Sequence, residues 1–209
     1  GFAAGQHALI CCDINGRLVK RPFTLSSDPE QRKLLSFTIK RNDQGVLSRH
    51  LHANSRKGDI IRILGQAMGE FLTPDLCLQQ ILMIGAGSGI TPFRSMLMDL
   101  RRKGFDGQIV LRHVCREPDD AIFGAEFRSL ATDWEPLDYQ PWYSKALGRP
   151  GTEDMLPAGW QPAAIATFLC GPAALMERVE AHRGQAHALD HLHMERFGLP
   201  MRPSAQAGK

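Results

Sequence analysis

Several features are missing from this 209-residue sequence, and each absence excludes a class of protein. No apolar run approaches the roughly 20 residues that cross a bilayer, so we predict no transmembrane segment. The five cysteines show neither a zinc spacing nor the four-cysteine spacing of a plant-type iron–sulfur cluster. Aromatic residues make up only 7% of the chain and do not alternate with basic ones, which argues against nucleic-acid binding.

The N-terminus shows no charged-then-apolar leader, so no secretory signal is visible. Scattered cysteines, odd in number, are typical of free thiols in a reducing compartment, and we predict a cytoplasmic protein. The chain begins at Gly1, inside what reads as a strand. We therefore expect a further N-terminal piece, in which a targeting signal would be invisible.

The composition is that of an ordinary globular protein, with an uneven charge distribution. Hydrophobic residues make up 43% and charged residues 22%, enough for one large domain or two small ones. Residues 1–75 hold 11 lysines and arginines against seven acidic residues, whereas residues 76–209 hold 14 against 15. The basic first part has two interpretations: a surface for a phosphate-rich cofactor or acidic partner, or simply a solvated face.

The first 75 residues read as short strands separated by turns. Apolar runs at 8–11, 34–39 and 59–64 are punctuated by asparagine–glycine and aspartate–proline pairs. This spacing predicts an antiparallel β-barrel with one short helix over residues 48–53. The opening strands of such a barrel are absent from the sequence, so we expect it to be incomplete at its N-terminus, with open edges.

After residue 75 strands and helices alternate. The apolar run 80–84 is typical of a strand buried on both faces, and Pro92 opens a helix that ends at Gly104. Further strands are predicted at 108–114 and 166–170, with helices at 125–132 and 173–182, the last stopped by Gly184. This order predicts a doubly wound parallel sheet with right-handed crossovers.

The expected fold class is therefore β + α/β in two domains. The antiparallel barrel would span residues 1–75, and the parallel-sheet nucleotide-binding domain would span residues 76–198. Residues 199–209 are rich in proline, glycine and alanine and would form a disordered tail or the stub of a linker.

A glycine-rich turn, Gly85 to Pro92, lies between the buried strand and its helix. Such a turn directs backbone N–H groups and the helix dipole at one point, which favours a phosphate, although a tight turn with nothing bound is the alternative. The pattern is not the G-x-G-x-x-G fingerprint. Cys170-Gly171-Pro172 repeats the geometry after a second strand, so Cys170 would share a sheet edge with Gly87 and Thr91, unless it is only a small buried residue.

The segment Arg21 to Ser27 brings together a cation, an aromatic ring and several hydroxyl groups. A flavin needs a cation for its phosphate, a surface for its ring and hydrogen bonds to its ring nitrogens. The alternative is an ordinary edge strand with a surface arginine. Gly45 to Ser48 precede the short helix, where Ser48 is either the N-cap or a phosphate contact.

Four motifs, taken together and in this order, resemble those of the ferredoxin–NADP reductase superfamily. They are R-x-[YF]-[ST]-x-S, G-x-x-S, the glycine turn ending in Thr-Pro, and C-G-P. The resemblance runs from about Gly5-Gln6 to Phe197 and is strongest to the bacterial modules that feed oxygenases and desaturases. It implies an NAD(P)H-dependent flavoprotein oxidoreductase. Hydride would pass from NAD(P)H to FAD, and electrons would then pass to a ferredoxin or another iron–sulfur protein or domain.

The resemblance also implies residue roles. Arg21 would bind the flavin phosphate, Phe23 would pack on the isoalloxazine, and Thr24 would hydrogen-bond near its N5. Thr91 and Cys170 would flank the nicotinamide. The predicted catalytic residues are Thr24, Cys170 and Glu195. The predicted cofactor-binding residues are Arg21, Pro22, Phe23, Thr24, Ile39, Lys40, Gly45, Val46, Leu47, Ser48, Gly87, Thr91, Pro92, Arg116, Cys170, Gly171, Pro172 and Phe197.

Some departures and alternatives stay open. Phe23 stands where the family usually has tyrosine, and Gln66 replaces a common proline. Arg116 would meet either the 2′-phosphate of NADPH or a ribose, and the acidic residues that follow it lean slightly towards NADH. The histidines near the C-terminus fit no standard metal site, so we predict none. The alternative functions are a direct flavin reductase of a small acceptor and a non-catalytic nucleotide-binding electron-transfer subunit.

Overall fold

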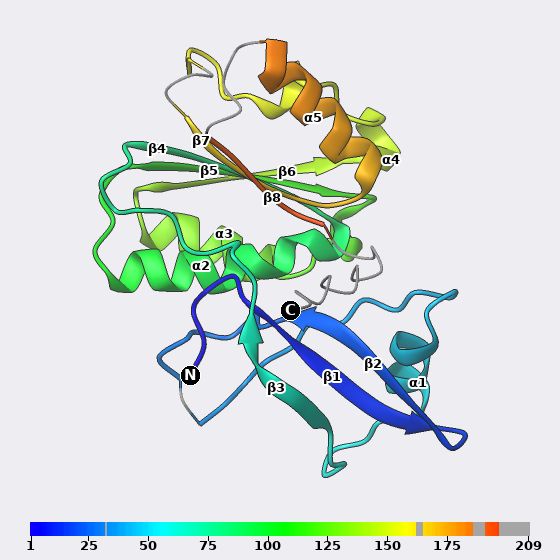
Figure 1. Cartoon of the computed structure of the whole chain (residues 1–209). Coiled ribbons are helices and arrows are strands. Elements are labelled where there is room, and N and C mark those ends of the chain that lie inside the picture. Colours follow the sequence, from blue (N-terminus) through cyan, green and yellow to red (C-terminus); the bar gives the residue numbers. More distant parts are fainter. Residues whose placement is uncertain (32, 162–164, 186–190, 197–209) are drawn as a thin grey trace, which may run out of the picture.

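The computed structural model describes residues 1–31, 33–161, 165–185 and 191–196. Within these residues the chain forms two sheets of different kinds (Figure 1). One is a three-stranded antiparallel sheet near the N-terminus, and the other is a five-stranded parallel sheet. The predicted contact Phe197 and the expected tail at 199–209 lie outside the described residues.

The first sheet has the strand order β2-β1-β3, with β1 (His7–Ile14), β2 (Arg17–Thr24) and β3 (Arg62–Met68). Asn15 and Gly16 join β1 to β2 with positive φ angles of 54° and 74°, the geometry of a tight hairpin. Within the described residues β2 and β3 each pair on one side only, so the antiparallel sheet is open at both edges. Helix α1 (Val46–Asn54) lies where the short helix was predicted.

Two strand predictions in this domain were inaccurate. The run 34–39 forms no strand but a single bridge between Leu25 and Phe37, because Leu34 and Leu35 are 58% and 46% exposed and gain little by pairing. The strand expected at 59–64 begins only at Arg62.

The second sheet has the order β6-β5-β4-β7-β8, and every neighbouring pair is parallel. Helices cover both of its faces, so the predicted doubly wound sheet is confirmed (Figure 1). The five strands are β4 (Gln80–Ala86), β5 (Gln108–Cys115), β6 (Leu137–Tyr143), β7 (Ala166–Cys170) and β8 (Leu192–Glu195).

The long helices are α2 (Thr91–Arg102) and α3 (Gly124–Asp133) on one face and α5 (Ala173–Gln185) on the other (Figure 1). Helix α2 begins one residue before Pro92, and α5 continues one residue past the predicted stop at Gly184. Short helical turns complete the domain: η1 (Gly87–Ile90), η2 (Pro118–Asp120), α4 (Ser144–Leu147) and η3 (Glu153–Met155).

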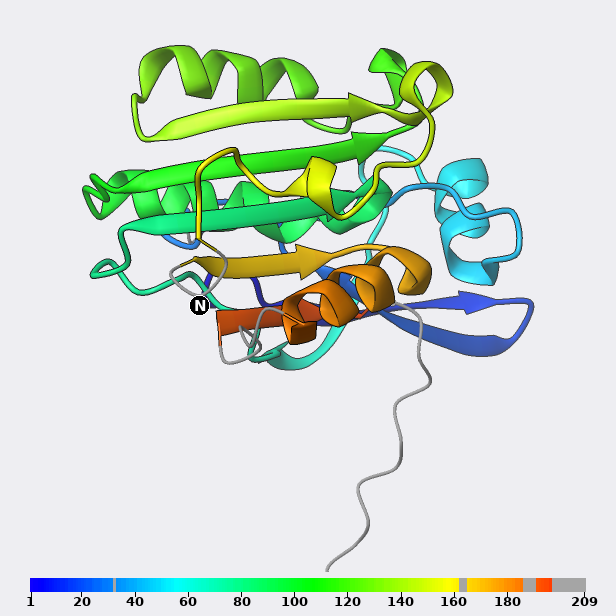
Figure 2. The ribbon, with the colours of Figure 1, turned by 90° about the horizontal axis from the view of Figure 1, so that it is seen from above.

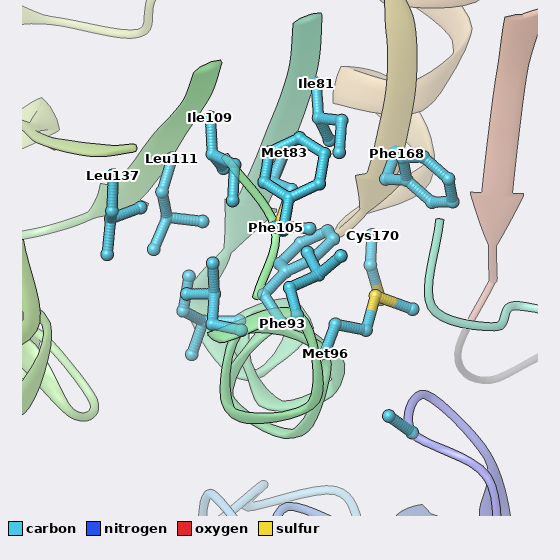
Figure 3. Close-up of a cluster of buried hydrophobic side chains, with 14 of the residues drawn as sticks. Ile81, Met83, Phe93, Met96, Phe105, Ile109, Leu111, Leu137, Phe168 and Cys170 are labelled. Carbon is cyan, nitrogen blue, oxygen red and sulfur yellow. The ribbon is translucent and has the colours of Figure 1, made fainter. Parts of the chain in front are cut away.

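The main core lies between the parallel sheet and helices α2 and α3. Figure 3 shows Ile81, Met83, Ile109 and Leu111 from the strands, which face Phe93 and Met96 of α2. A second cluster fills the space beneath α5. These clusters explain why β4 is apolar along nearly its whole length, since it is buried on both faces.

Two segments that flank the antiparallel sheet also enter this core. Phe71, in the connection between β3 and β4, packs edge-on against Phe93 and Phe168, with 5.8 Å between ring centroids in both pairs. Ala4 joins the same cluster from the N-terminal segment. The domain boundary expected after residue 75 falls within this connection and stays a proposal.

Candidate functional site

The two glycine motifs of the nucleotide domain meet at the carboxyl edge of the sheet. Strands β4 and β7 are neighbours, with Gly85 opposite Cys170. A Cβ atom on Gly89 would lie 2.1 Å from the carbonyl oxygen of Cys170, and one on Gly171 would lie 2.9 Å from the Cβ of Ala86. The absence of side chains at Gly89 and Gly171 therefore lets the two turns pack together, at the point where open α/β sheets bind ligands.

Gly87 differs from the other glycines of its turn. A Cβ on Gly85 would meet Ile90 at 2.7 Å, whereas a Cβ on Gly87 would meet nothing within 4 Å. Gly87 also has a φ of +57°, a conformation that favours glycine. Of the turn's first and second glycines, it is therefore Gly87 that leaves open space for a ligand.

The N-terminus of α2 follows directly and suits an anion. Its cap residue, Ile90, has no side-chain acceptor, and the first turn carries no acidic residue. Thr91 is 3% exposed, and its hydroxyl donates to the carbonyl of Ser88 at 2.9 Å, which fixes the turn. Pro92 occupies the second helical position, where its missing N–H costs no helical hydrogen bond.

Cys170 ends β7 with its side chain in the main core. It is fully buried, in the cluster that contains Met96 and Phe168 (Figure 3). Burial raises the pKa of the Cys170 thiol well above its ordinary value, and the nearby Glu195 carboxylate raises it further. The thiol is therefore neutral at pH 7 and presents a small apolar wall rather than a nucleophile. Gly171 and the exposed Pro172 lead from it into α5.

Glu195 lies beside Cys170, its register partner on β8. Burial raises the pKa of Glu195, so its proton is held more tightly than that of an exposed glutamate. The Nδ1 atom of His7 lies 3.7 Å from its Oε1 atom. His7 in turn sits opposite Thr24 in the first sheet. Strand register thus places Thr24 beside His7 and Cys170 beside Glu195, and the His7–Glu195 pair is the side-chain contact between them.

Sequence reasoning did not identify His7. Its only signal was its position directly after Gly5-Gln6, where the family resemblance begins. Burial lowers the pKa of His7, so the imidazole is neutral at pH 7. His7 and Glu195 therefore face each other as two partly desolvated groups at the domain junction.

On the first sheet, the predicted flavin contacts occupy the second half of β2. Arg21 and Pro22 are exposed, and Nη1 of Arg21 donates to the carbonyl of the adjacent Lys20, at 2.8 Å. Phe23 is half-buried and packs against the small cluster that includes Ile39. Thr24 is 5% exposed. A free guanidinium, an aromatic ring and a hydroxyl thus follow one another, a set that fits a flavin phosphate and ring.

The helix α1 begins differently from our prediction. Gly45 is its N-cap, so of the two roles predicted for Ser48 the N-cap is excluded, and the phosphate contact stays a prediction. The Ser48 hydroxyl is buried; its single proton is shared between the carbonyls of Asn42 and Gly45, at 3.2 and 3.3 Å, and its oxygen accepts from the Asn42 N–H at 3.2 Å. A Cβ on Gly45 would lie 2.7 Å from this hydroxyl, which explains the G-x-x-S spacing. Because Gly45 has no side-chain acceptor, the first-turn N–H groups suit an anion.

The other predicted contacts near α1 differ in what they can offer a ligand. Val46 is exposed, whereas Leu47 is 1% exposed and contributes its side chain to the small core. The carbonyl of Ile39 lies 2.7 Å from Nε2 of His52. Lys40 is exposed and close enough to Cys115 at the end of β5 to lower the pKa of that thiol, although burial raises it overall. Lys40 therefore faces the nucleotide domain.

Arg116 follows β5 and is exposed. Its carbonyl accepts a 2.9 Å hydrogen bond from the backbone N–H of Lys145. The Lys145 ammonium is paired with Glu117 at 2.7 Å. A second cation therefore lies near Arg116, but a carboxylate already binds it.

The carboxyl ends of the parallel strands point towards the side where α1 lies (Figure 2). Helix α1 and the glycine-rich turn that follows the carboxyl end of β4 thus belong to one side of the molecule. An antiparallel domain with a flavin-type strand, followed by a doubly wound domain with a phosphate turn, defines the class of two-domain oxidoreductases that combine a flavin with a nicotinamide nucleotide.

Sequence comparison identifies the family within that class. Residues 1–71 match the family described as Oxidoreductase FAD-binding domain, and residues 83–181 match the Oxidoreductase NAD-binding domain. The chain therefore belongs to the ferredoxin–NADP reductase superfamily, whose cofactors are FAD and a nicotinamide nucleotide.

Curated relatives cover nearly the whole chain. The chain is 33% identical to an NADPH oxidoreductase of Mycobacterium tuberculosis, over 99% of this chain and 55% of that protein. It is 30% identical to NADH oxidoreductase HCR of Escherichia coli, over 99% and 63%. The ferredoxin reductase component of a 3-ketosteroid-9-alpha-monooxygenase from Mycolicibacterium smegmatis is 32% identical, over 86% and 50%. The chain thus spans between half and two thirds of their length.

Among solved structures, phthalate dioxygenase reductase shares the fold with a TM-score of 0.75 and 24% identity, over 97% of this chain and 60% of that one. In the part of the chain that the structure describes, no helix combines the length and apolar character needed to cross a membrane.

Proposed function

We propose that this chain takes a hydride from NAD(P)H onto FAD and passes the electrons to an iron–sulfur protein or domain. The observation that carries this proposal is one contact between the two domains: His7, the register partner of Thr24, lies 3.7 Å from Glu195, the register partner of Cys170. Bound FAD supplies a ring that accepts a hydride and releases electrons one at a time.

The residues of the chain would bind, orient and shield the cofactors. Arg21 and the uncapped N-terminus of α1 would hold the flavin phosphates, with Phe23 beside the ring. The N-terminus of α2 and the open space at Gly87 would hold the nicotinamide nucleotide. Such positioning is the protein's main contribution to hydride transfer.

The polar residues at the junction would control protons near the reacting atoms. The hydroxyl of Thr24 would donate a hydrogen bond near the flavin N5. Burial raises the pKa of Glu195, so this carboxyl would take up a proton more readily than an exposed glutamate, with the His7 imidazole as its neighbour. The neutral Cys170 thiol would pack in the core beneath the nicotinamide, at the end of β7.

We propose an iron–sulfur acceptor because two similar proteins point to one. The Mycolicibacterium smegmatis relative is the ferredoxin reductase component of a monooxygenase. Phthalate dioxygenase reductase is described as a modular structure for electron transfer from pyridine nucleotides to [2Fe-2S]. The five free thiols are compatible with the reducing cytoplasm, which we propose as the location.

For the electron donor we propose NADH. The named donors of the relatives differ, since one is an NADPH oxidoreductase and another an NADH oxidoreductase. In this chain the Lys145 ammonium is already paired with Glu117. Arg116 would therefore have to bind the 2′-phosphate of NADPH without help from Lys145, which argues against NADPH. An acidic side chain after the second strand of a dinucleotide-binding sheet favours a ribose 2′-hydroxyl.

The first test concerns flavin binding. Arg21→Gln should weaken FAD affinity about 10-fold or more, since a charge-assisted hydrogen bond contributes roughly 1.5–3 kcal/mol. Arg17→Gln removes an exposed arginine of the same strand and is the matched control. Retained flavin is measured by absorbance after gel filtration. Equal retention in the two variants would contradict the assignment of Arg21.

Steady-state assays of the FAD-loaded chain test the donor and the acceptor. With a dye acceptor, kcat/KM should be higher for NADH than for NADPH. With an added plant-type ferredoxin, reduction should outpace that of a quinone such as menadione. Fast quinone reduction without ferredoxin would favour a direct reductase of small acceptors, and bound nucleotide without any turnover would favour a non-catalytic subunit.

A further inference from the structure

The side chain of Arg94 connects the two domains, and the proposed function has given it no role. It lies in the first turn of α2, three residues after Thr91. Its Nη1 atom donates a 2.5 Å hydrogen bond to the backbone carbonyl of Ser26 in the flavin domain. Its Nε atom donates to both carboxylate oxygens of Glu126 on α3, at 2.9 and 2.8 Å.

The guanidinium is held firmly in this position. Its central carbon lies 5.0 Å from the ring centroid of Phe123, within the range of a cation–π interaction. The Arg94 side chain is 20% exposed, so solvent screens these contacts only in part. A planar guanidinium can donate to a carboxylate and to a carbonyl in fixed directions at once, which a lysine ammonium does less well.

Ser26 links Arg94 to the predicted flavin contacts. It follows Thr24 by two residues and is fully buried. Its N–H donates to the carbonyl of Ser36 at 2.8 Å, and its hydroxyl lies 3.1 Å from that of Thr38. Ser26 therefore lies just after β2 and is hydrogen-bonded to the segment that precedes Ile39. A shift of the Ser26 carbonyl would displace both parts of the flavin domain.

An open groove of about 610 Å³ lies beside Arg94. Asp28 and Gln31 line it from the flavin domain, and residues of α2 and α3 line it from the nucleotide domain. The apolar contact through Phe71 lies elsewhere, in the main core, so Arg94 supplies the direct polar connection here.

We propose that Arg94 is a positioning residue that holds the flavin-domain loop at Ser26 against α2 and so sets the distance between Thr24 and the nucleotide turn at Gly87. This inference rests on the proposed hydride transfer, whose rate falls steeply when the reacting groups are misplaced by about 1 Å. Arg94 acts through Ser26, whereas Glu126 and Phe123 orient its guanidinium.

The test compares Arg94→Met and Arg94→Lys with Arg101→Met. Arg101 is on the same helix and makes one long hydrogen bond, 3.5 Å, to the carbonyl of Asp133, so it is the matched control. The first measurement needs no cofactor: amide hydrogen exchange of a peptide that contains Ser26. Arg94→Met should speed this exchange at least fivefold, Arg94→Lys should have a smaller effect, and Arg101→Met should match the wild type.

The second measurement is flavin reduction by stopped flow at saturating NADH. Arg94→Met should slow it at least 10-fold while the KM for NADH stays within twofold and flavin content is unchanged. Arg94→Lys should recover part of the rate. A purely structural role would lower stability without this split between rate and KM.

A wild-type reduction rate in Arg94→Met would overturn the positioning role, and so would unchanged exchange at Ser26. Equal slowing in Arg94→Met and Arg101→Met would overturn it as well, because the effect would then belong to the helix in general. If the wild type itself does not reduce its flavin, the proposed function fails, and the exchange measurement still decides whether Arg94 holds the loop.

Discussion

Gly87 and Gly89 stand two residues apart in one turn, and the structure gives them different tasks. Gly89 leaves room for the carbonyl of Cys170, whereas Gly87 adopts a positive φ beside open space. The sequence predicts the glycine turn but not this division. The division depends on a backbone carbonyl that β7 brings in from the far part of the domain, and no local pattern contains that information.

These two glycines give a matched pair of variants. Gly89→Ala places a Cβ 2.1 Å from a backbone oxygen, so we expect a stability loss of about 1–3 kcal/mol or more in urea unfolding. Gly87→Ala meets no atom but is strained by about 1–2 kcal/mol at its φ of +57°, and its methyl group should raise the KM for NADH. A Gly87→Ala variant with unchanged KM would remove Gly87 from the nucleotide site.

Among the proposed site residues, His7 is the clearest case of one that sequence patterns cannot reveal. A single histidine in a first strand carries no periodic or motif signal. Its significance comes from two pairings, one with Thr24 across the β1–β2 hairpin and one with Glu195 from the other end of the chain. Residue types at Arg21 and Cys170 were informative because each stands within a short ordered motif.

At the scale of secondary-structure elements, burial separates what was predicted from what was missed. Strand β4 was predicted because burial on both faces demands a continuous apolar run. Strand β6 was not, because an edge strand tolerates Pro141 and polar residues between its apolar ones. The strand predicted at 34–39 was wrong for the opposite reason: the run is apolar, but the fold leaves Leu34 and Leu35 exposed.

Strands β5 and β6 are joined by a buried polar pair that makes stability depend on pH. His113 is fully buried, and its Nδ1 atom lies 3.0 Å from the Tyr139 hydroxyl. Burial lowers the pKa of His113 from 6.5 to about 4. In the unfolded chain His113 binds a proton near pH 6.5, whereas in the folded chain it does so only near pH 4. The free energy of unfolding therefore decreases as the pH falls from about 6.5 to about 4.

At pH 5 this loss should be about 2 kcal/mol relative to pH 7.5. A double variant, His113→Leu with Tyr139→Phe, replaces both polar partners with apolar groups and should lack this part of the pH dependence. Urea unfolding at the two pH values measures it in both proteins. An identical pH dependence in the wild type and the double variant would show that His113 is not its source.

At the scale of the whole molecule, the reaction depends on how two separate sheets meet. The order of domains and the doubly wound topology follow from sequence pattern, since β-rich and alternating segments differ in period and composition. The junction does not follow from pattern. It depends on contacts between residues far apart in sequence. These are Phe71 with Phe93, His7 with Glu195, and Arg94 with Ser26.

The central claim is that this chain, with FAD bound, accepts a hydride from a nicotinamide nucleotide. The most direct measurement mixes the FAD-loaded chain with excess NADH without oxygen and follows the oxidised-flavin absorbance by stopped flow. We predict that the band disappears in a single turnover, more slowly when the transferred hydrogen of NADH is deuterium. A flavin that stays bound and oxidised in excess NADH and in excess NADPH would contradict the account.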